Sequence, residues 1–164
     1  MTEQSGLQFL NGLLQAKQSE EQMLDWVYPT SYQAVDVAIL KGDQILLGKK
    51  KKDGDLWRFI GGFADPNSES LEEDAAREVL EETGLTVENI KYVASCTIDD
   101  ARYKNSPHSI KSAIFLSDYS GGEPSAQDDI DDVQWFHYST LNGEQIVSEH
   151  RKVLDILKEN TNIH

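Results

Sequence analysis

The chain has 164 residues, enough for one domain with a hydrophobic core. Its 15 Lys and Arg against 29 Asp and Glu give a net charge of −14, which argues against a nonspecific nucleic-acid surface or an anionic membrane as a partner. The sequence has neither an apolar stretch long enough to span a membrane nor a signal-peptide pattern, and its single cysteine, Cys96, cannot form an internal disulfide. We therefore expect a cytoplasmic protein with no membrane or nucleic-acid partner.

Apolar residues at helical spacing predict an N-terminal helix over residues 7–27, which Pro29 ends. We expect this arm, residues 1–30, to cover the sheet or to pack on a second subunit, so a homodimer is compatible with it. Residues 31–164 form the predicted main domain.

Alternating apolar residues between turn signals predict six short strands around a central helix, with another helix near the end of the chain. The predicted strands are 33–40, 44–48, 56–60, 91–98, 112–116 and 133–136, and the predicted helices are 69–83 and 144–158. This arrangement predicts an α+β fold or an α/β/α sandwich and leaves the strand order open.

The most informative segment is 61–85, GGFADPNSESLEEDAAREVLEETGL. Glutamates three and four apart share one helix face, so Glu78 lies beside Glu81 and Glu82. Close carboxylates repel unless a cation or a proton compensates, and Mg²⁺ or Mn²⁺ prefer oxygen ligands. A Glu-rich helix is more often a solvated face. Here, however, the patch lies toward the helix C-terminus, where the dipole disfavours negative charge, which favours a metal site.

The same segment resembles the signature of Nudix hydrolases: a glycine, five residues, a glutamate, seven residues, Arg-Glu, an aliphatic residue, any residue, Glu-Glu, any residue, a glycine and an aliphatic residue. From Glu69 to Leu85 the chain fits without a gap. Between Gly62 and Glu69 it has six residues where the pattern has five. A surface loop absorbs one insertion at small cost, but the placement of Glu69 and the glycines relative to the helix stays open.

The resemblance implies an α/β/α sandwich with a mixed β-sheet and an enzyme that needs a divalent metal, Mg²⁺ or Mn²⁺. The family's metal-ligand positions are matched by Glu78, Glu81 and Glu82. The resemblance also makes the Gly61 carbonyl a candidate ligand, and it implies that Arg77 orients a carboxylate. Glu69 could be an outer metal ligand or simply a negative charge at the helix N-terminus.

The general base has two candidates. Relatives often carry it in a loop before the late strand, and the spacing back from Trp135 puts Asp129 at the matching position. A solvated acidic loop is the alternative interpretation of Asp129. Glu78 is the other candidate base.

Substrate contacts are expected from Lys50 in the four-lysine run and from Arg58, because a phosphorylated substrate needs local cations on so acidic a chain. A solvated turn is the alternative interpretation of the lysine run. Trp57 could stack on a base, although aromatic residues near a sheet are more often core. His150 has no second histidine placed to form a zinc pair and is expected to be structural or at the surface. Segment 55–63 resembles the approach to the signature in ADP-ribose pyrophosphatases. The predicted substrate-binding set is Lys50, Trp57, Arg58 and Glu69.

The resemblance implies hydrolysis of the diphosphate linkage of ADP-ribose or a related nucleoside diphosphate sugar, giving a nucleoside monophosphate and a sugar phosphate. One alternative is a nucleoside triphosphate pyrophosphatase that removes damaged nucleotides, with pyrophosphate as a product. Another is a nucleotide-sensing module without turnover, against which the intact glutamates argue. The base, the sugar, the ion count and the oligomeric state stay open.

Overall fold

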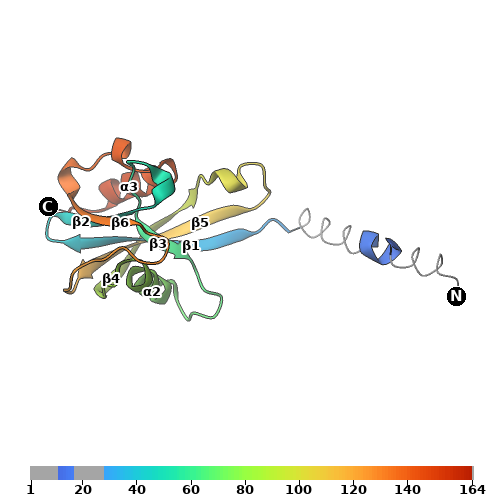
Figure 1. The fold of residues 1–164 in the computed structure, drawn as a ribbon, viewed down its shortest axis with the longest axis horizontal. Helices are drawn as coiled ribbons and strands as arrows, with labels where there is room; N and C mark the ends of the chain where they lie inside the picture. The colour runs from blue at the N-terminus through green and yellow to red at the C-terminus, as the bar shows by residue number, and fades with distance from the viewer. Residues whose placement is uncertain (1–10, 17–27, 164) are drawn as a thin grey trace.

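The computed structural model describes residues 11–16 and 28–163 and shows two helices packed on opposite faces of a β-sheet (Figure 1). The strands are β1 (Ser31–Lys41), β2 (Gln44–Lys49), β3 (Ile60–Phe63), β4 (Val87–Ile98), β5 (Ser109–Tyr119) and β6 (Asp132–His137). The helices are α2 (Leu71–Thr83) and α3 (Ser148–Asn160), with short 3-10 helices η1 (Lys51–Asp53), η2 (Ala101–Tyr103), η3 (Tyr138–Thr140) and η4 (Gly143–Gln145).

The sheet is mixed, with the order β4-β5-β1-β2-β6 and β3 paired on β1. The β1–β5 pair is parallel and the other pairs are antiparallel. One edge of β1 is divided between two partners: its first half pairs with β3, and its last residues pair with β2. This division sets Gly61 and Gly62 of β3 directly beside Asp36 and Val35.

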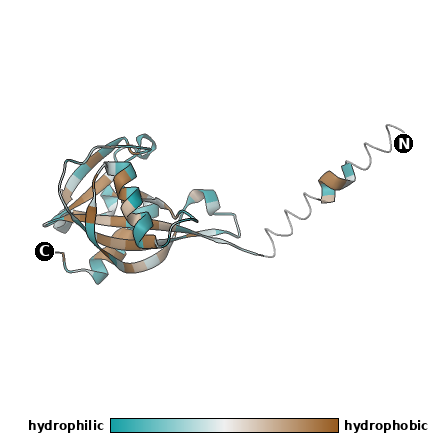
Figure 2. Cartoon of the chain, turned by 90° about the horizontal axis from the view of Figure 1, so that it is seen from below, coloured by the Kyte–Doolittle hydropathy of each residue, from teal (hydrophilic) through white to brown (hydrophobic). Residues whose placement is uncertain are grey.

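Each face of the sheet carries its own core, because side chains alternate along the strands. The core under α2 comprises Val35, Val37, Ile39, Leu46, Ile60, Ala75, Val79, Leu85, Ala113 and Phe115. The core under α3 comprises Ala38, Ile45, Leu47, Trp57, Phe59, Cys96, Ile114, Tyr138, Leu141, Ile146, Val153, Leu154 and Leu157. Figure 2 shows hydrophobic residues concentrated in the central strands. Cys96 is one of these core residues.

The α+β sandwich with a mixed sheet is confirmed, and several predicted bounds shift. The third strand covers Ile60–Phe63 rather than 56–60, because Trp57 and Arg58 make only isolated bridges. Helix α2 begins at Leu71, since Ser70 is its N-cap and accepts a hydrogen bond from a backbone amide of the first turn. Helix α3 begins at Ser148 because a 3-10 turn precedes it.

Most of the predicted N-terminal arm lies outside the described residues, so the arm and the homodimer stay predictions. Residues 11–16 are helical and exposed. Within the described residues, no helix has the length and apolar character needed to cross a membrane.

We predict that Gly61→Ala destabilises the fold by about 1–3 kcal/mol, the usual cost of overpacking. A Cβ at this position would lie 2.0 Å from the carbonyl oxygen of Val35. Because the obstacle is backbone, β1 and β3 would have to move apart. Urea denaturation measures the change in the free energy of unfolding.

The matched control is Gly143→Ala, where a Cβ would meet only the Arg151 side chain at 3.9 Å. This variant should stay within about 0.5 kcal/mol of the wild type. Equal unfolding midpoints for the two variants would contradict the close packing of β3 on β1.

Candidate active site

A cleft of about 360 Å³ opens where β1, β3, the second half of α2, the start of α3 and the loop before β6 meet. Its charged and polar walls comprise Asp36, Lys50, Lys52, Arg58, Glu78, Glu82, Asp100, Arg102, Asp128, Asp129, Glu149 and His150. Gly61, Gly62 and Phe63 also line it. The fold thus brings together six of the predicted site residues: Lys50, Arg58, Gly61, Glu78, Glu82 and Asp129.

The glycine pair of β3 lies directly against two glutamates of α2. The backbone N–H of Gly61 donates a hydrogen bond to Oε2 of Glu82 at 3.0 Å. A Cβ on Gly62 would lie 2.7 Å from the carboxyl carbon and both oxygens of Glu78. Only a residue without a side chain allows α2 to come so close, and the two carboxyl groups are held against the strand as a result.

Burial dominates the electrostatics of this glutamate pair. Burial raises the pKa of the Glu82 carboxyl to about 8, although the Gly61 amide and Lys50 act in the opposite direction. Burial also raises the pKa of Glu78, against the attraction of Arg77. The charge of Glu78 further raises the pKa of Glu82, and the charges of Glu81 and Asp128 further raise the pKa of Glu78. The ionised forms of these carboxyl groups therefore lack full compensation within the protein, and oxygen donors of this kind suit a hard divalent cation.

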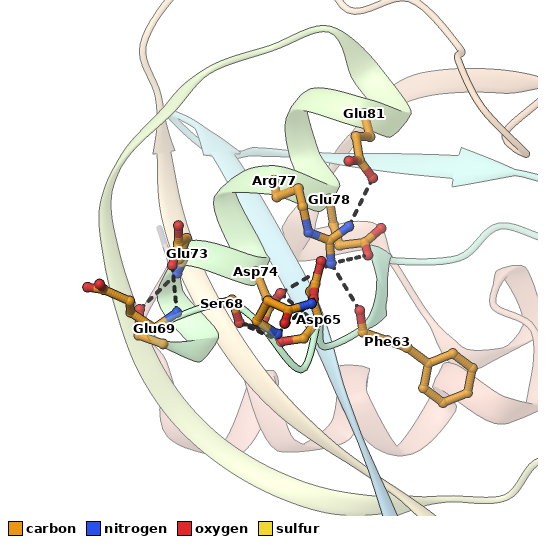
Figure 3. A network of polar contacts seen from close by, with 11 residues as sticks. Phe63, Asp65, Ser68, Glu69, Glu73, Asp74, Arg77, Glu78 and Glu81 are labelled. Carbon is orange, nitrogen blue, oxygen red and sulfur yellow. Dashed lines mark hydrogen bonds and ion pairs between the residues drawn. The ribbon is translucent and has the colours of Figure 1, made fainter.

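Arg77 joins α2 to the end of β3 (Figure 3). Its guanidinium contacts Oε1 of Glu78 at 2.9 Å, Oδ1 of Asp74 at 3.2 Å and Oε2 of Glu81 at 2.9 Å. It also donates to the carbonyl oxygen of Phe63 at 3.0 Å. Arg77 therefore restrains the Glu78 carboxylate from outside the cleft, since it does not line the cleft itself.

The three glutamates of the predicted metal trio do not converge. Glu78 and Glu82 are buried toward the sheet, whereas Glu81 is exposed and turns to Arg77. Among the residues that the structure describes, no three His, Cys, Asp or Glu side chains are grouped as a ready metal site. Helical spacing puts the three glutamates on one surface of α2. Packing against the sheet buries Glu78 and Glu82 and leaves Glu81 exposed at the edge of that surface.

Asp129 lies in the cleft and forms an ion pair with the ammonium group of Lys50. Burial would raise the pKa of Asp129, but the hydrogen bond and the charge of Lys50 hold it below its ordinary value. The start of its loop is fixed to α2, since the backbone N–H of Gln127 donates to the carbonyl of Glu82 at 2.9 Å. Asp129 is thus an ionised carboxylate of the cleft wall, beside Glu82.

Arg58 is the second predicted cation of the cleft, and it is already paired. Its Nε and Nη2 donate to the two carboxylate oxygens of Asp53 at 2.6 and 2.8 Å. A bidentate pair fixes the plane of the guanidinium. Arg58 therefore presents a positioned positive charge to the cleft.

Two predicted substrate contacts lie elsewhere. Trp57 is 9% exposed in the core under α3, where its ring packs on Phe136 with the ring centres 5.0 Å apart. Glu69 is exposed before the first turn of α2, and its N–H donates to the Glu73 carboxylate at 2.8 Å. Neither residue lines the cleft. Both substrate contacts therefore stay predictions. The structure places Glu69 at the opposite end of α2 from Glu82, where a negative charge complements the helix dipole.

Asp74 explains how the loop with the extra residue is accommodated. Its Oδ1 accepts from the N–H of Asp65 at 2.9 Å, and its Oδ2 accepts from Oγ of Ser68 at 2.7 Å. Burial works against ionisation of Asp74, but these hydrogen bonds and Arg77 lower its pKa below the ordinary value. The loop is therefore anchored by the helix. Sequence reasoning missed Asp74, and the available signal was an acidic residue three positions before Arg77.

Asp36 was also missed, although a charged residue between Val35 and Val37 of an apolar strand is an unusual pattern. Arg102 and Glu149 line the cleft as well. Nothing in the local sequence of Arg102 distinguishes it from an ordinary exposed charge.

A family model described as NUDIX domain matches residues 30–157 of the chain. A protein of Pasteurella multocida named NAD-capped RNA hydrolase NudC is 36% identical over 114 residues, and a protein of the same name from Pseudomonas entomophila is 38% identical over 116. The matches cover 68% and 70% of this chain, but only 40% and 39% of those proteins. The chain thus spans about two fifths of the length of these relatives.

Solved structures agree with the fold. The MutT NUDIX hydrolase of Burkholderia pseudomallei superposes with a TM-score of 0.65 at 23% identity, covering 77% of this chain and 98% of that one. An ADP-ribose pyrophosphatase of Streptococcus suis superposes with a TM-score of 0.60 at 26% identity, covering 81% and 94%. With its matching domain model, its relatives and its glutamate–glycine site, the chain belongs to the Nudix hydrolase family.

Proposed function

We propose that the chain is a divalent-metal-dependent pyrophosphohydrolase that cleaves ADP-ribose or a related nucleoside diphosphate sugar into a nucleoside monophosphate and a sugar phosphate. The observation that carries the proposal is the pair of buried carboxyl groups of Glu78 and Glu82, held against Gly61 and Gly62 in a cleft that also contains fixed cations. The likeness to a Streptococcus suis protein named ADP-ribose pyrophosphatase supports this choice of substrate class.

Family members generally need a divalent metal ion, and the donor set of the cleft fits one. Glu78 and Glu82 would hold the ion, with the Gly61 carbonyl as a further ligand. Glu81 would become a ligand only after its ion pair with Arg77 breaks. When bound, such an ion neutralises phosphate oxygens and makes a water molecule a stronger nucleophile. We expect Mg²⁺ or Mn²⁺, because both prefer oxygen ligands.

The other residues of the site bind the substrate, accept a proton or position Glu78. Lys50 and Arg58 bind the diphosphate, since both present cations on the cleft wall. Asp129 is ionised and can accept a proton, with Glu78 as the alternative base. Arg77 is a positioning residue that orients Glu78 through their 2.9 Å contact.

The relatives named NAD-capped RNA hydrolase favour a second candidate substrate, a nicotinamide dinucleotide attached to RNA. Because these relatives are named for an RNA substrate, the absence of a nucleic-acid partner stays a prediction. The cytoplasmic location also stays a prediction, as do the two alternatives of a triphosphate pyrophosphatase and a non-catalytic sensor.

Product identification tests the reaction directly. With Mn²⁺ or Mg²⁺, the protein should convert ADP-ribose to AMP and ribose 5-phosphate, as measured by chromatography of the reaction mixture. NAD-capped RNA and nucleoside triphosphates belong in the same panel. Release of pyrophosphate from a triphosphate as the preferred reaction would favour the triphosphate pyrophosphatase, and no turnover of any substrate would favour the sensor.

The variant Glu82→Gln should lower kcat by about 100-fold or more, because it removes a metal ligand and its negative charge. Wild-type protein should also gain thermal stability on addition of Mn²⁺, and this gain should disappear in the variant. The matched control is Glu72→Gln, the same change at an exposed position on the same helix. Full activity of Glu82→Gln would remove Glu82 from the metal site.

Glu82 should also make the metal-free protein less stable as the pH rises. Its folded pKa of about 8 lies above the ordinary value of 4.5, so the folded state holds the proton more tightly between these two values. The associated stability is present below pH 4.5 and is lost as the pH rises toward 8. Urea denaturation in the presence of a chelator measures the free energy of unfolding at each pH. As the pH rises toward 8, this free energy should fall further in wild type than in Glu82→Gln, by at least about 1 kcal/mol. Parallel pH profiles would mean that Glu82 is already ionised in the fold.

A further inference from the structure

A polar pair, Asp36 and His150, lines the cleft on the α3 side of the sheet and has no part in the proposed reaction. Asp36 lies in the middle of β1, where Val35 and Val37 point into the core under α2. Alternation along the strand therefore turns Asp36 toward α3, which carries His150. Asp36 is only 5% exposed, so its carboxylate is a costly group to place here without a purpose.

Each member of the pair uses one of its two polar atoms within the fold. Oδ2 of Asp36 accepts a hydrogen bond from Oγ of Ser112 at 2.5 Å. Nδ1 of His150 accepts from the backbone N–H of Phe59 at 3.0 Å. A neutral imidazole that accepts at Nδ1 carries its proton on Nε2. Burial lowers the pKa of His150, although Asp36 acts in the opposite direction, and the ring is therefore neutral at pH 7.

The two remaining atoms face each other without bonding. Nε2 of His150 lies 3.6 Å from Oδ1 of Asp36, which is too long for a hydrogen bond. In the part of the chain that the structure describes, no other group donates to Oδ1 of Asp36 or accepts from Nε2 of His150. A donor and an acceptor are thus both available to a ligand at one point of the cleft wall.

The chemistry of this point selects a hydroxyl group. A phosphate would be repelled by the Asp36 carboxylate, and a cation would meet the N–H of His150. A hydroxyl both donates and accepts, so it can accept from Nε2–H of His150 while donating to Oδ1 of Asp36.

The location indicates which part of a substrate reaches the pair. Asp36 is the register partner of Gly61, whose N–H binds Glu82. The pair therefore lies on the α3 side of the β1–β3 pair, whereas the carboxylates proposed to act at the diphosphate lie on its α2 side, and both groups line the same cleft. In a nucleoside diphosphate sugar, the groups next to the diphosphate are its two sugars.

We infer that Asp36 and His150 form a specificity subsite that binds a sugar hydroxyl of the substrate, an inference that rests on the proposed function. Ser112 and the Phe59 amide hold the pair in place from behind. Neither residue belongs to the Nudix signature segment. The residues that select the substrate would thus come from β1 and α3, outside that segment.

Three substrates test the inference: ADP-ribose, the β-methyl ester of ADP, which lacks the terminal sugar, and an ADP-ribose analogue with 2′-deoxyadenosine. Asp36→Asn and His150→Asn should each raise the KM of ADP-ribose about tenfold, with a smaller change in kcat. The variants should lose this effect on the substrate that lacks the recognised hydroxyl. If the variants no longer raise KM with the methyl ester, the recognised hydroxyl is on the terminal sugar. If they no longer raise KM with the deoxy analogue, it is on the nucleoside ribose.

The histidine variants separate the subsite from a structural role. An asparagine at position 150 can still accept from the Phe59 amide but has no group at the place of Nε2. His150→Gln extends an amide N–H toward the cleft and should restore much of the discrimination. The control Ser117→Ala removes a buried hydroxyl that has no partner among the described residues of the fold, and it should leave KM unchanged for every substrate.

An equal loss of kcat/KM on all three substrates in both variants would overturn the inference, because a structural pair affects every substrate alike. If wild type cleaves none of the three, the proposed function fails and the inference fails with it. Cleavage by wild type with unchanged KM ratios in the variants overturns the inference alone. If Asp36→Asn does not give a cooperative unfolding transition, His150→Asn and His150→Gln decide the outcome.

Discussion

The site depends on the close approach of helix α2 to the glycine pair of β3. Gly61 touches the backbone of β1 at a distance that allows no Cβ, and Gly62 leaves the space that the Glu78 carboxyl fills. The helix can therefore press Glu78 and Glu82 against backbone instead of against side chains. Their burial follows from this contact, and so does the raised pKa of both groups. A site that buries two carboxyl groups in this way favours the binding of a cation, which compensates their negative charge when they ionise.

The same contact needs support outside the cleft, which Arg77 and Asp74 provide. Arg77 joins three acidic side chains of α2 to the last carbonyl of β3, and Asp74 holds the loop between strand and helix. Because the anchors are on the helix, the loop can vary in length without moving the glutamates. The additional residue between Gly62 and Glu69 is therefore a local variation of the loop, and the rest of the signature keeps its spacing.

Local periodicity explains which features could be predicted from the sequence. The strands, the central helix and the shared face of Glu78 and Glu82 depend on repeats of two and 3.6 residues, which a sequence displays directly. Trp57 and Glu81 could not be placed this way. The Trp57 backbone bridges to the segment before α3 and its ring enters the core, while Glu81 turns to Arg77. Both outcomes depend on contacts between elements. The Asp36–His150 pair is the extreme case, since its members are brought together only by the packing of α3 on β1.

Two cations of the cleft, Arg58 and Lys50, are bound to aspartates before any substrate arrives. Arg58 is fixed by two bonds to Asp53, so it meets a phosphate with little further loss of side-chain freedom. Lys50 is bound to Asp129, and a diphosphate that binds Lys50 competes with that carboxylate for the same ammonium group. Under the proposed function, substrate binding at Lys50 therefore weakens the interaction that keeps the pKa of Asp129 low. The carboxylate proposed as base becomes a better proton acceptor when the diphosphate is in place.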